Sequence, residues 1–166
     1  MSAITIRPEQ ASDVAAIRDL TAAAFRDAAL SDGSEPGIVD ALRRDGDLTL
    51  SLVAETAERL VGHVALSPVS ITDGSRDWYG LGPISVLPEY QGEGIGFRLM
   101  KRAIADIRAM GARGIVLLGN PAYYARFGFE HDPELRYPGT PAEYFQRLVL
   151  EGDTPSGTVS YAPAFG

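Results

Sequence analysis

The sequence predicts one α/β domain of the α+β type, and three observations support this. Its 166 residues are the length of one ordinary domain, so we expect residues 1–166 to form a single unit. Apolar residues make up 45% of the chain, which is enough for a sizeable core. Three strand-like segments with short connections span residues 48–87, and an amphipathic helix and a buried strand follow them.

The N-terminal part predicts a short strand and two helices. Residues 4–7 alternate as a strand does, and Pro8 ends this segment. Ser12 or Asp13 can cap the helix that follows, in which apolar residues recur at helical spacing. The composition of residues 31–37 is typical of a loop, and a short second helix is expected over residues 38–44.

The middle of the chain predicts an antiparallel meander followed by a helix. The expected strands cover residues 48–55, 59–71 and 78–87, and short turns join them. The apolar period then changes to that of a helix over residues 95–110, which Gly111 closes.

The last third of the chain is harder to interpret. Residues 114–118 form an unbroken apolar run, which predicts a buried strand. A short helix is expected over residues 121–127, because Pro121 suits the first helical position. Residues 144–150 fit either a strand or a helix, and residues 157–162 predict a closing strand.

The composition excludes several functional classes. The absence of cysteine excludes disulfides and thiolate chemistry, and two histidines make a zinc site improbable, so no metal is expected. The net charge of −7 and the lack of a basic run disfavour nucleic-acid binding. The sequence shows neither a signal-peptide pattern nor an apolar stretch of membrane-spanning length, so we expect no membrane association and a cytoplasmic protein.

The most informative segment is a glycine loop between a predicted strand and the long helix. Glycines let successive backbone amides point to one side without obstruction by side chains. The helix start adds unpaired amides and the positive end of the helix dipole. Together they predict an anion site that suits a phosphate or pyrophosphate. The loop reads Gln91-Gly92-Glu93-Gly94-Ile95-Gly96.

Three other interpretations of this loop compete. A nucleoside-triphosphate loop needs Gly-Lys-Ser/Thr at the helix start, but Phe97 and Arg98 follow Gly96 here. The dinucleotide fingerprint needs a glycine where Phe97 stands, and a strand–helix–strand unit instead of a meander. From the glycines alone, a tight turn that only needs positive backbone angles stays an alternative.

Positive charge follows the loop along the helix. Arg98, Lys101 and Arg102 could reach an anion near the helix start, and Lys101 is the only lysine in the chain. A solvated helix face explains each of these charges equally well.

Two segments together resemble the GNAT acyltransferase superfamily. Residues 91–96 match the family's loop, Gln/Arg-x-x-Gly-x-Gly/Ala, in full, and the lead-in Val-x-Pro-x-Tyr at residues 86–90 matches too. Residues 120–129 resemble the family's Asn…Tyr-x-x-x-Gly-Phe segment, and Gly-Leu-Gly-Pro at residues 80–83 is similar to small bacterial members. The resemblance covers residues 3–130 well and the C-terminal part loosely.

The resemblance implies a mixed, mostly antiparallel sheet with helices on both faces, splayed between the fourth strand (78–87) and the fifth (114–118). Acetyl-CoA would lie in this opening as co-substrate, with its pantetheine arm along the fourth strand and its pyrophosphate on the loop amides. The implied cofactor-binding residues are Ile84, Ser85, Val86, Gln91, Gly92, Glu93, Gly94, Ile95, Gly96, Asn120, Tyr123 and Phe127.

The resemblance also implies direct attack of a primary amine on the thioester. Tyr124, four residues before Gly128, stands at the family's general-acid position, although it could instead only pack. Tyr123 is the alternative acid if the helix rotates by one residue. A backbone amide near Val86 is the implied donor to the oxyanion.

A general base is not evident, because the fourth strand lacks the carboxylate that many relatives carry. His63 and Glu35 are candidates, but a structural histidine and a solvated glutamate explain them as well. A water chain, or an amine that arrives neutral, would need no dedicated base.

We therefore expect an acetyl-CoA-dependent N-acetyltransferase that acts on a small-molecule or protein amine, as a monomer or homodimer. A non-catalytic CoA-binding regulatory module is one alternative. An acyltransferase that uses a longer acyl-CoA is another.

Overall fold

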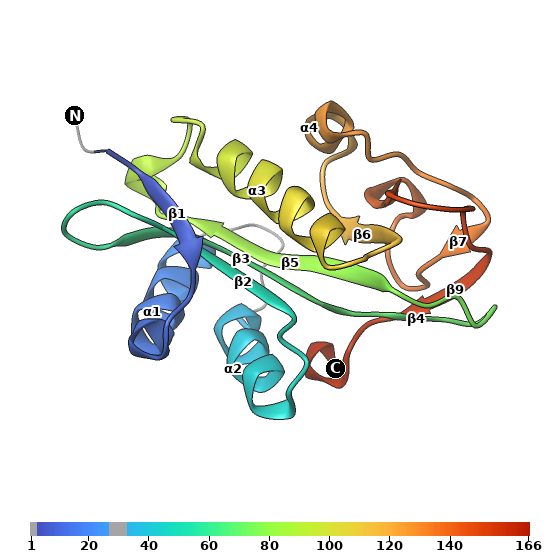
Figure 1. The fold of residues 1–166 in the computed structure, drawn as a ribbon, viewed down its shortest axis with the longest axis horizontal. Coiled ribbons are helices and arrows are strands. Elements are labelled where there is room, and N and C mark those ends of the chain that lie inside the picture. The colour runs from blue at the N-terminus through green and yellow to red at the C-terminus, as the bar shows by residue number, and fades with distance from the viewer. Residues whose placement is uncertain (1–2, 27–32) are drawn as a thin grey trace.

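The computed structural model describes residues 3–26 and 33–166, and its centre is a six-stranded sheet (Figure 1). The strand order is β1-β2-β3-β5-β6-β8, and only the β5–β6 pair is parallel. The predicted mixed, mostly antiparallel sheet is confirmed. The strands are β1 (Thr5–Pro8), β2 (Leu50–Glu55), β3 (Leu60–Pro68), β5 (Trp78–Val86), β6 (Gly114–Leu118) and β8 (Phe145–Val149).

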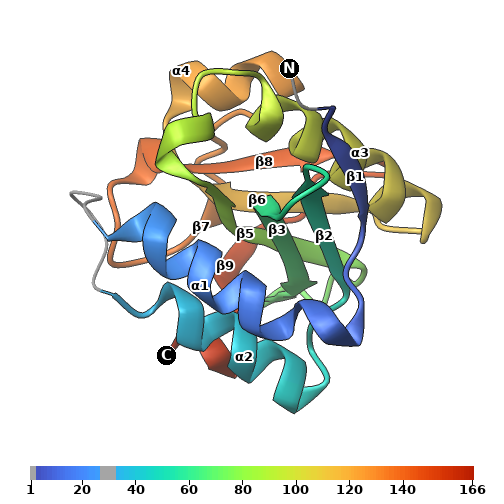
Figure 2. The same ribbon diagram turned by 90° about the vertical axis from the view of Figure 1, so that its left-hand side faces the viewer.

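Helices cover both faces of this sheet, as predicted (Figures 1 and 2). Helices α1 (Val14–Phe25) and α2 (Glu35–Asp45) lie on one face, and α3 (Ile95–Ala109) lies on the other. Helix α2 begins three residues before the predicted start at residue 38. Pro36 stands in its first turn, where a missing amide hydrogen costs no hydrogen bond. Of the loop predicted over residues 31–37, residues 33 and 34 precede the helix, and residues 31 and 32 lie outside the described residues.

The sheet opens between β5 and β6. These strands pair only through residues 78–80 of β5 and 114–116 of β6. The rest of β5 continues along β3, whereas β6 continues along β8, so the two strands part towards Val86. The splay expected between the fourth and fifth predicted strands is confirmed.

The main core lies between the sheet and α3. Leu99, Met100 and Ile107 of α3 have no exposed surface, as the predicted apolar face requires. The helix lies close to the sheet at Gly62, where a Cβ atom would be 3.0 Å from Leu99 Cδ1. This packing fixes the start of α3, and therefore the glycine loop, relative to β5.

A second, three-stranded sheet corrects the predicted strand over residues 59–71. β3 pairs with β5, but the next segment, β4 (Ser70–Ile71), pairs with β9 (Gly157–Ser160) instead. β9 also pairs in parallel with β7 (Leu135–Arg136). The extended pattern of residues 59–71 does not reveal the change of partner. Residues 144–150 could be a strand or a helix, and the structure shows a strand. This strand, β8, follows the short 3-10 helix Ala142–Tyr144.

Gly114→Ala is expected to destabilise the fold by about 1–3 kcal/mol, because the added methyl group would overlap the Trp78 ring in a packed core. The urea midpoint measures this effect. Gly37→Ala is a suitable control, because Gly37 sits inside α2 and, in the described part of the chain, nothing beyond its neighbours and its own helix backbone lies within 4 Å of the new methyl group. We expect it to stabilise the protein slightly. Equal midpoints for both variants would contradict the close contact.

No helix among the described residues is long and apolar enough to cross a membrane. Within the same residues, no group of three or more histidine or acidic side chains is placed to hold a metal ion.

Candidate active site

The glycine loop has the backbone geometry of an anion site. Gly92 and Gly94 have φ angles of +80° and +83°, in the left-handed region that favours glycine. The amide of Arg98 donates to the carbonyl of Gly94, at a distance of 3.1 Å, in the first turn of α3. The amides of Ile95 and Gly96 therefore lack partners within the helix. The helix dipole adds to the attraction for an anion.

Gln91 anchors the loop to the end of β5. Its side-chain amide donates to the carbonyl of Val86, with 3.0 Å between Nε2 and the oxygen. The side chain therefore stabilises the loop itself.

The free edge of β5 faces the opening. The amide of Leu87 donates to Val61 on β3, so the polar groups of Leu87 and Ser85 point towards β3. Those of Ile84 and Val86 point the other way, towards the opening. The Ser85 side chain is buried on the α1–α2 face, opposite His63. Of the three predicted β5 residues, Ile84 and Val86 thus offer main-chain groups to a ligand.

A hollow of about 370 Å³ lies over the loop. Gln91, Gly92, Gly94, Ile95 and Gly96 line it from one side, together with Val86. Tyr123 and Arg126 line it from the other side, so the structure brings the two predicted motifs together. Glu93 is exposed and is not among the lining residues.

Asn120 begins the second motif by capping a short helix. Its side-chain oxygen accepts from the amide of Ala122 at 2.9 Å, and Pro121 follows as the first residue of α4 (Pro121–Tyr124). The helix predicted over residues 121–127 is confirmed, with its last turn a 3-10 helix, Ala125–Phe127. The side-chain amide hydrogens of Asn120 remain able to donate to a ligand.

Tyr123 and Phe127 join this segment to the start of α3. The Tyr123 hydroxyl is 3.7 Å from the position that a Cβ atom on Gly96 would occupy. The Phe127 ring centroid lies 5.4 Å from that of Phe97. Both aromatic residues therefore stand across the opening from the glycine loop.

Tyr124 points to a different place from Tyr123. Its ring lies on Gly119, where even a Cβ atom would overlap it. Burial raises the pKa of Tyr124 to about 12, and Tyr123 adds to the rise, so the phenol keeps its proton at neutral pH. The role of Gly119 could not be predicted from the sequence, because a single glycine after a strand does not indicate which ring will pack on it.

Comparison with known families decides the classification. Residues 5–131 match the family described as "Acetyltransferase (GNAT) domain", which is well over half of the chain. The chain belongs to the GNAT acetyltransferase family. Its members are acyltransferases, and both predicted motifs fall inside the matched residues.

Curated relatives of this GNAT domain come from Escherichia coli. The uncharacterized N-acetyltransferase YhbS of strain K12 is 39% identical over 129 residues, which cover 75% of this chain and 77% of YhbS. The uncharacterized N-acetyltransferase YjhQ of the same strain is 35% identical over 138 residues, which cover 80% of this chain and 72% of YjhQ.

Two solved structures are similar over nearly the whole GNAT domain. A GNAT family acetyltransferase from Brucella melitensis, in complex with acetyl-CoA, has a TM-score of 0.89 and 48% identity, and the match covers 100% of both chains. Escherichia coli YhbS in complex with CoA has a TM-score of 0.88 and 34% identity, with 99% of this chain and 93% of the other covered.

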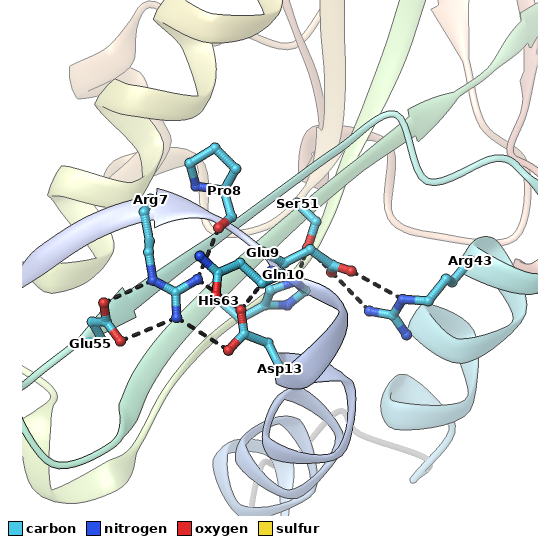
Figure 3. Close-up of polar contacts among 9 residues, drawn as sticks. All are labelled: Arg7, Pro8, Glu9, Gln10, Asp13, Arg43, Ser51, Glu55 and His63. Atoms are coloured by element: carbon cyan, nitrogen blue, oxygen red, sulfur yellow. Dashed lines mark hydrogen bonds and ion pairs between the residues drawn. The ribbon is translucent and has the colours of Figure 1, made fainter.

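His63 lies away from the opening, in a buried polar chain (Figure 3). Its Nε2 atom is 2.8 Å from the Ser51 hydroxyl, which donates to Glu9, and Glu9 forms an ion pair with Arg43. Because the single Ser51 proton goes to the carboxylate, the hydroxyl accepts from Nε2–H of His63. Nδ1 is then unprotonated and has no partner among the described residues. His63 thus has a structural position on β3, where its side chain contacts Ser51 of β2.

Glu35, the other candidate base, is not brought to Tyr124 either. It is the first residue of α2 and lines a hollow with Phe25 and Arg26 of the α1 end. The structure therefore brings Tyr123 and Arg126 of the second motif to the loop, whereas Tyr124 lies on Gly119 and neither candidate base lines the hollow.

We expect His63 to make the fold sensitive to acid. Burial lowers the pKa of His63 from 6.5 to about 4, with Glu9 raising it and Arg43 lowering it. Between pH 6.5 and 4 the unfolded chain binds a proton that the folded chain does not. As the pH is lowered through this window, the free energy of unfolding should therefore fall by about 1.4 kcal/mol per pH unit. Above this window, His63 should cause no change.

Urea midpoints at pH 7, 5 and 4 measure this dependence. His63→Gln is the matched variant, since it cannot titrate and should show a flatter profile above pH 4. Hydrogen bonds from Arg7 lower the pKa of Asp13 and of Glu55, so both carboxyl groups also cost stability towards the acid end of this range, but they do so equally in the two proteins. Parallel profiles for the two proteins would contradict the buried neutral state of His63.

Proposed function

We propose that this chain is an acetyl-CoA-dependent N-acetyltransferase that transfers an acetyl group to a primary amine. The observation that carries the proposal is the meeting of two groups across the opening between β5 and β6. One is the glycine loop, Gln91 to Gly96, with the amides of Ile95 and Gly96 unpaired in the helix start, and the other is the phenol-bearing segment of α4. The similar Brucella melitensis protein in complex with acetyl-CoA supports the choice of ligand.

The residues present fit acetyl-CoA. The left-handed glycines and the start of α3 suit the negative pyrophosphate. The edge of β5 at Ile84 and Val86, whose amides face the opening, suits an extended amide-bearing arm, which can pair with it as an added strand does, while the Val86 carbonyl already accepts from Gln91. The side-chain amide of Asn120 and the rings of Tyr123 and Phe127 would hold the arm from the other side.

The bound co-substrate would supply the acetyl group as a thioester, which a primary amine attacks directly. The amides of Ile84 and Val86 face the opening, so a main-chain donor near Val86 would stabilise the negative carbonyl oxygen. Tyr124 would hold its proton until the sulfur leaves as a thiolate, and would then donate it from the phenol oxygen. The high pKa of Tyr124 keeps this proton available throughout the ordinary pH range.

We assign no side chain as general base. His63 is fully buried in its own hydrogen-bonded chain, and Glu35 stands at the start of α2. An amine that arrives neutral, or one that loses its proton to water, fits this arrangement. We propose a cytoplasmic monomer or homodimer with a small-molecule or protein amine as acceptor.

Two measurements test the function. Calorimetric titration should give a dissociation constant for CoA well below millimolar, and a millimolar or weaker value would overturn the proposal. Release of free thiol from acetyl-CoA should then respond to at least one amine in an acceptor panel. Tight CoA binding with no amine-dependent release would instead indicate a non-catalytic CoA-binding module.

A further inference from the structure

A second hollow, of about 280 Å³, lies beside the loop and is lined by positive side chains. Lys101 and Arg108 line it from α3, and Arg126 lines it together with Phe127 and Leu148. Arg126 also lines the hollow over the glycine loop, so the two hollows adjoin at this residue. Among the described residues, no carboxylate lines this second hollow.

The three cations are not neutralised by the protein. Within residues 3–26 and 33–166, no ion pair joins Lys101, Arg108 or Arg126 to a carboxylate. The other cations of α3 differ, since Arg102 pairs with Asp106 at 2.9 Å and Arg98 donates to the carbonyl of Ile4. In a chain of net charge −7, three positive side chains without an ion pair among the described residues thus line one hollow.

Arg126 is held in position before any ligand binds. Its Nε atom donates to the carbonyl of Tyr123 at 2.8 Å, and its guanidinium carbon lies 4.2 Å from the centre of the Tyr123 ring. The ring attracts the cation and limits its freedom. The remaining guanidinium hydrogens can bind a phosphate with little further loss of entropy.

We propose that Lys101, Arg108 and Arg126 form a second anion site, which binds the ribose 3′-phosphate of CoA. The inference rests on the proposed function. CoA carries two anionic groups, the pyrophosphate and the 3′-phosphate on the neighbouring ribose. If the pyrophosphate binds on the glycine loop, the 3′-phosphate can bind in the adjoining hollow, where the three cations have no ion pair. The site would therefore distinguish CoA from its 3′-dephospho form.

Calorimetric titration of CoA and 3′-dephospho-CoA tests this site. The wild-type protein should bind CoA about tenfold more tightly, as expected for a few partly exposed charge contacts. The double variant Lys101→Ala, Arg108→Ala and the single variant Arg126→Gln should each bring the preference to threefold or less. Dephospho-CoA should bind the double variant about as it binds the wild type, whereas Arg126→Gln, which also changes the hollow over the loop, should weaken CoA more than dephospho-CoA. The wild-type preference should also shrink between about 50 and 500 mM salt, because the screening length becomes about threefold shorter.

The second ligand makes the outcomes distinguishable. A variant that only distorts the site would weaken both ligands equally, and would overturn the assignment of its residue. Equal wild-type binding of the two ligands would overturn the second anion site but leave the proposed function standing. No binding of either ligand would overturn the proposed function itself. Arg102→Ala is the control, because this ion-paired arginine should leave the preference unchanged.

Discussion

Gly94→Glu is expected to abolish CoA binding, with a loss in affinity of at least about 100-fold, or 2.7 kcal/mol. Gly94 has a φ angle of +83° immediately before α3, so any side chain there strains the turn by about 1–2 kcal/mol. The new carboxylate would also stand beside the free amides of Ile95 and Gly96, where it repels a pyrophosphate and can take its place. Calorimetric titration with CoA measures the loss.

A matched variant separates the site from general damage. Gly74 has a nearly identical φ angle of +84° and equally open surroundings, but it lies in the turn after β4, away from Val86 at the other end of β5. Gly74→Glu introduces the same strain and charge, and should leave CoA affinity unchanged. Gly94→Ala should show the strain without the charge. Binding by Gly94→Glu within about threefold of the wild type would mean that the loop is not the pyrophosphate site.

The fold was predictable where local sequence determines it. The meander and the long helix follow from short connections and apolar periods, whereas the splay was implied by the resemblance to the GNAT family. The second sheet does not, because β7 has only two residues and pairs with a strand more than twenty positions away. A two-residue strand has no period of its own, and its partner depends on the tertiary arrangement.

The candidate site also has parts that the sequence predicts and parts that it does not. The loop from Gln91 to Gly96 could be predicted because glycine pattern and backbone conformation are tied closely together. The position of His63 could not, since its chain through Ser51 to Glu9 joins three separate segments. Nor could sequence alone tell that Gly119 gives Tyr124 its place, while Tyr123 reaches Gly96 instead.

Tyr124→Phe is expected to lower turnover by about 10²–10⁴-fold while leaving CoA affinity nearly unchanged. The variant removes only the phenol oxygen, so the ring can still lie on Gly119. Steady-state thiol release gives the turnover, and titration gives the affinity. Because the pKa of Tyr124 is raised to about 12, the wild-type rate should show no loss from phenol ionisation below about pH 11.

Tyr123→Phe and Gly119→Ala define what the Tyr124 result means. Tyr123 directs its hydroxyl towards Gly96, at the loop, so its loss should affect CoA affinity more than turnover. Gly119→Ala should reduce turnover with the Tyr124 phenol still present, because the methyl group displaces the ring. A larger fall in turnover for Tyr123→Phe than for Tyr124→Phe would make Tyr123 the acid. Unchanged turnover in both would remove the phenols from the chemistry, and the leaving thiolate would then take its proton from water.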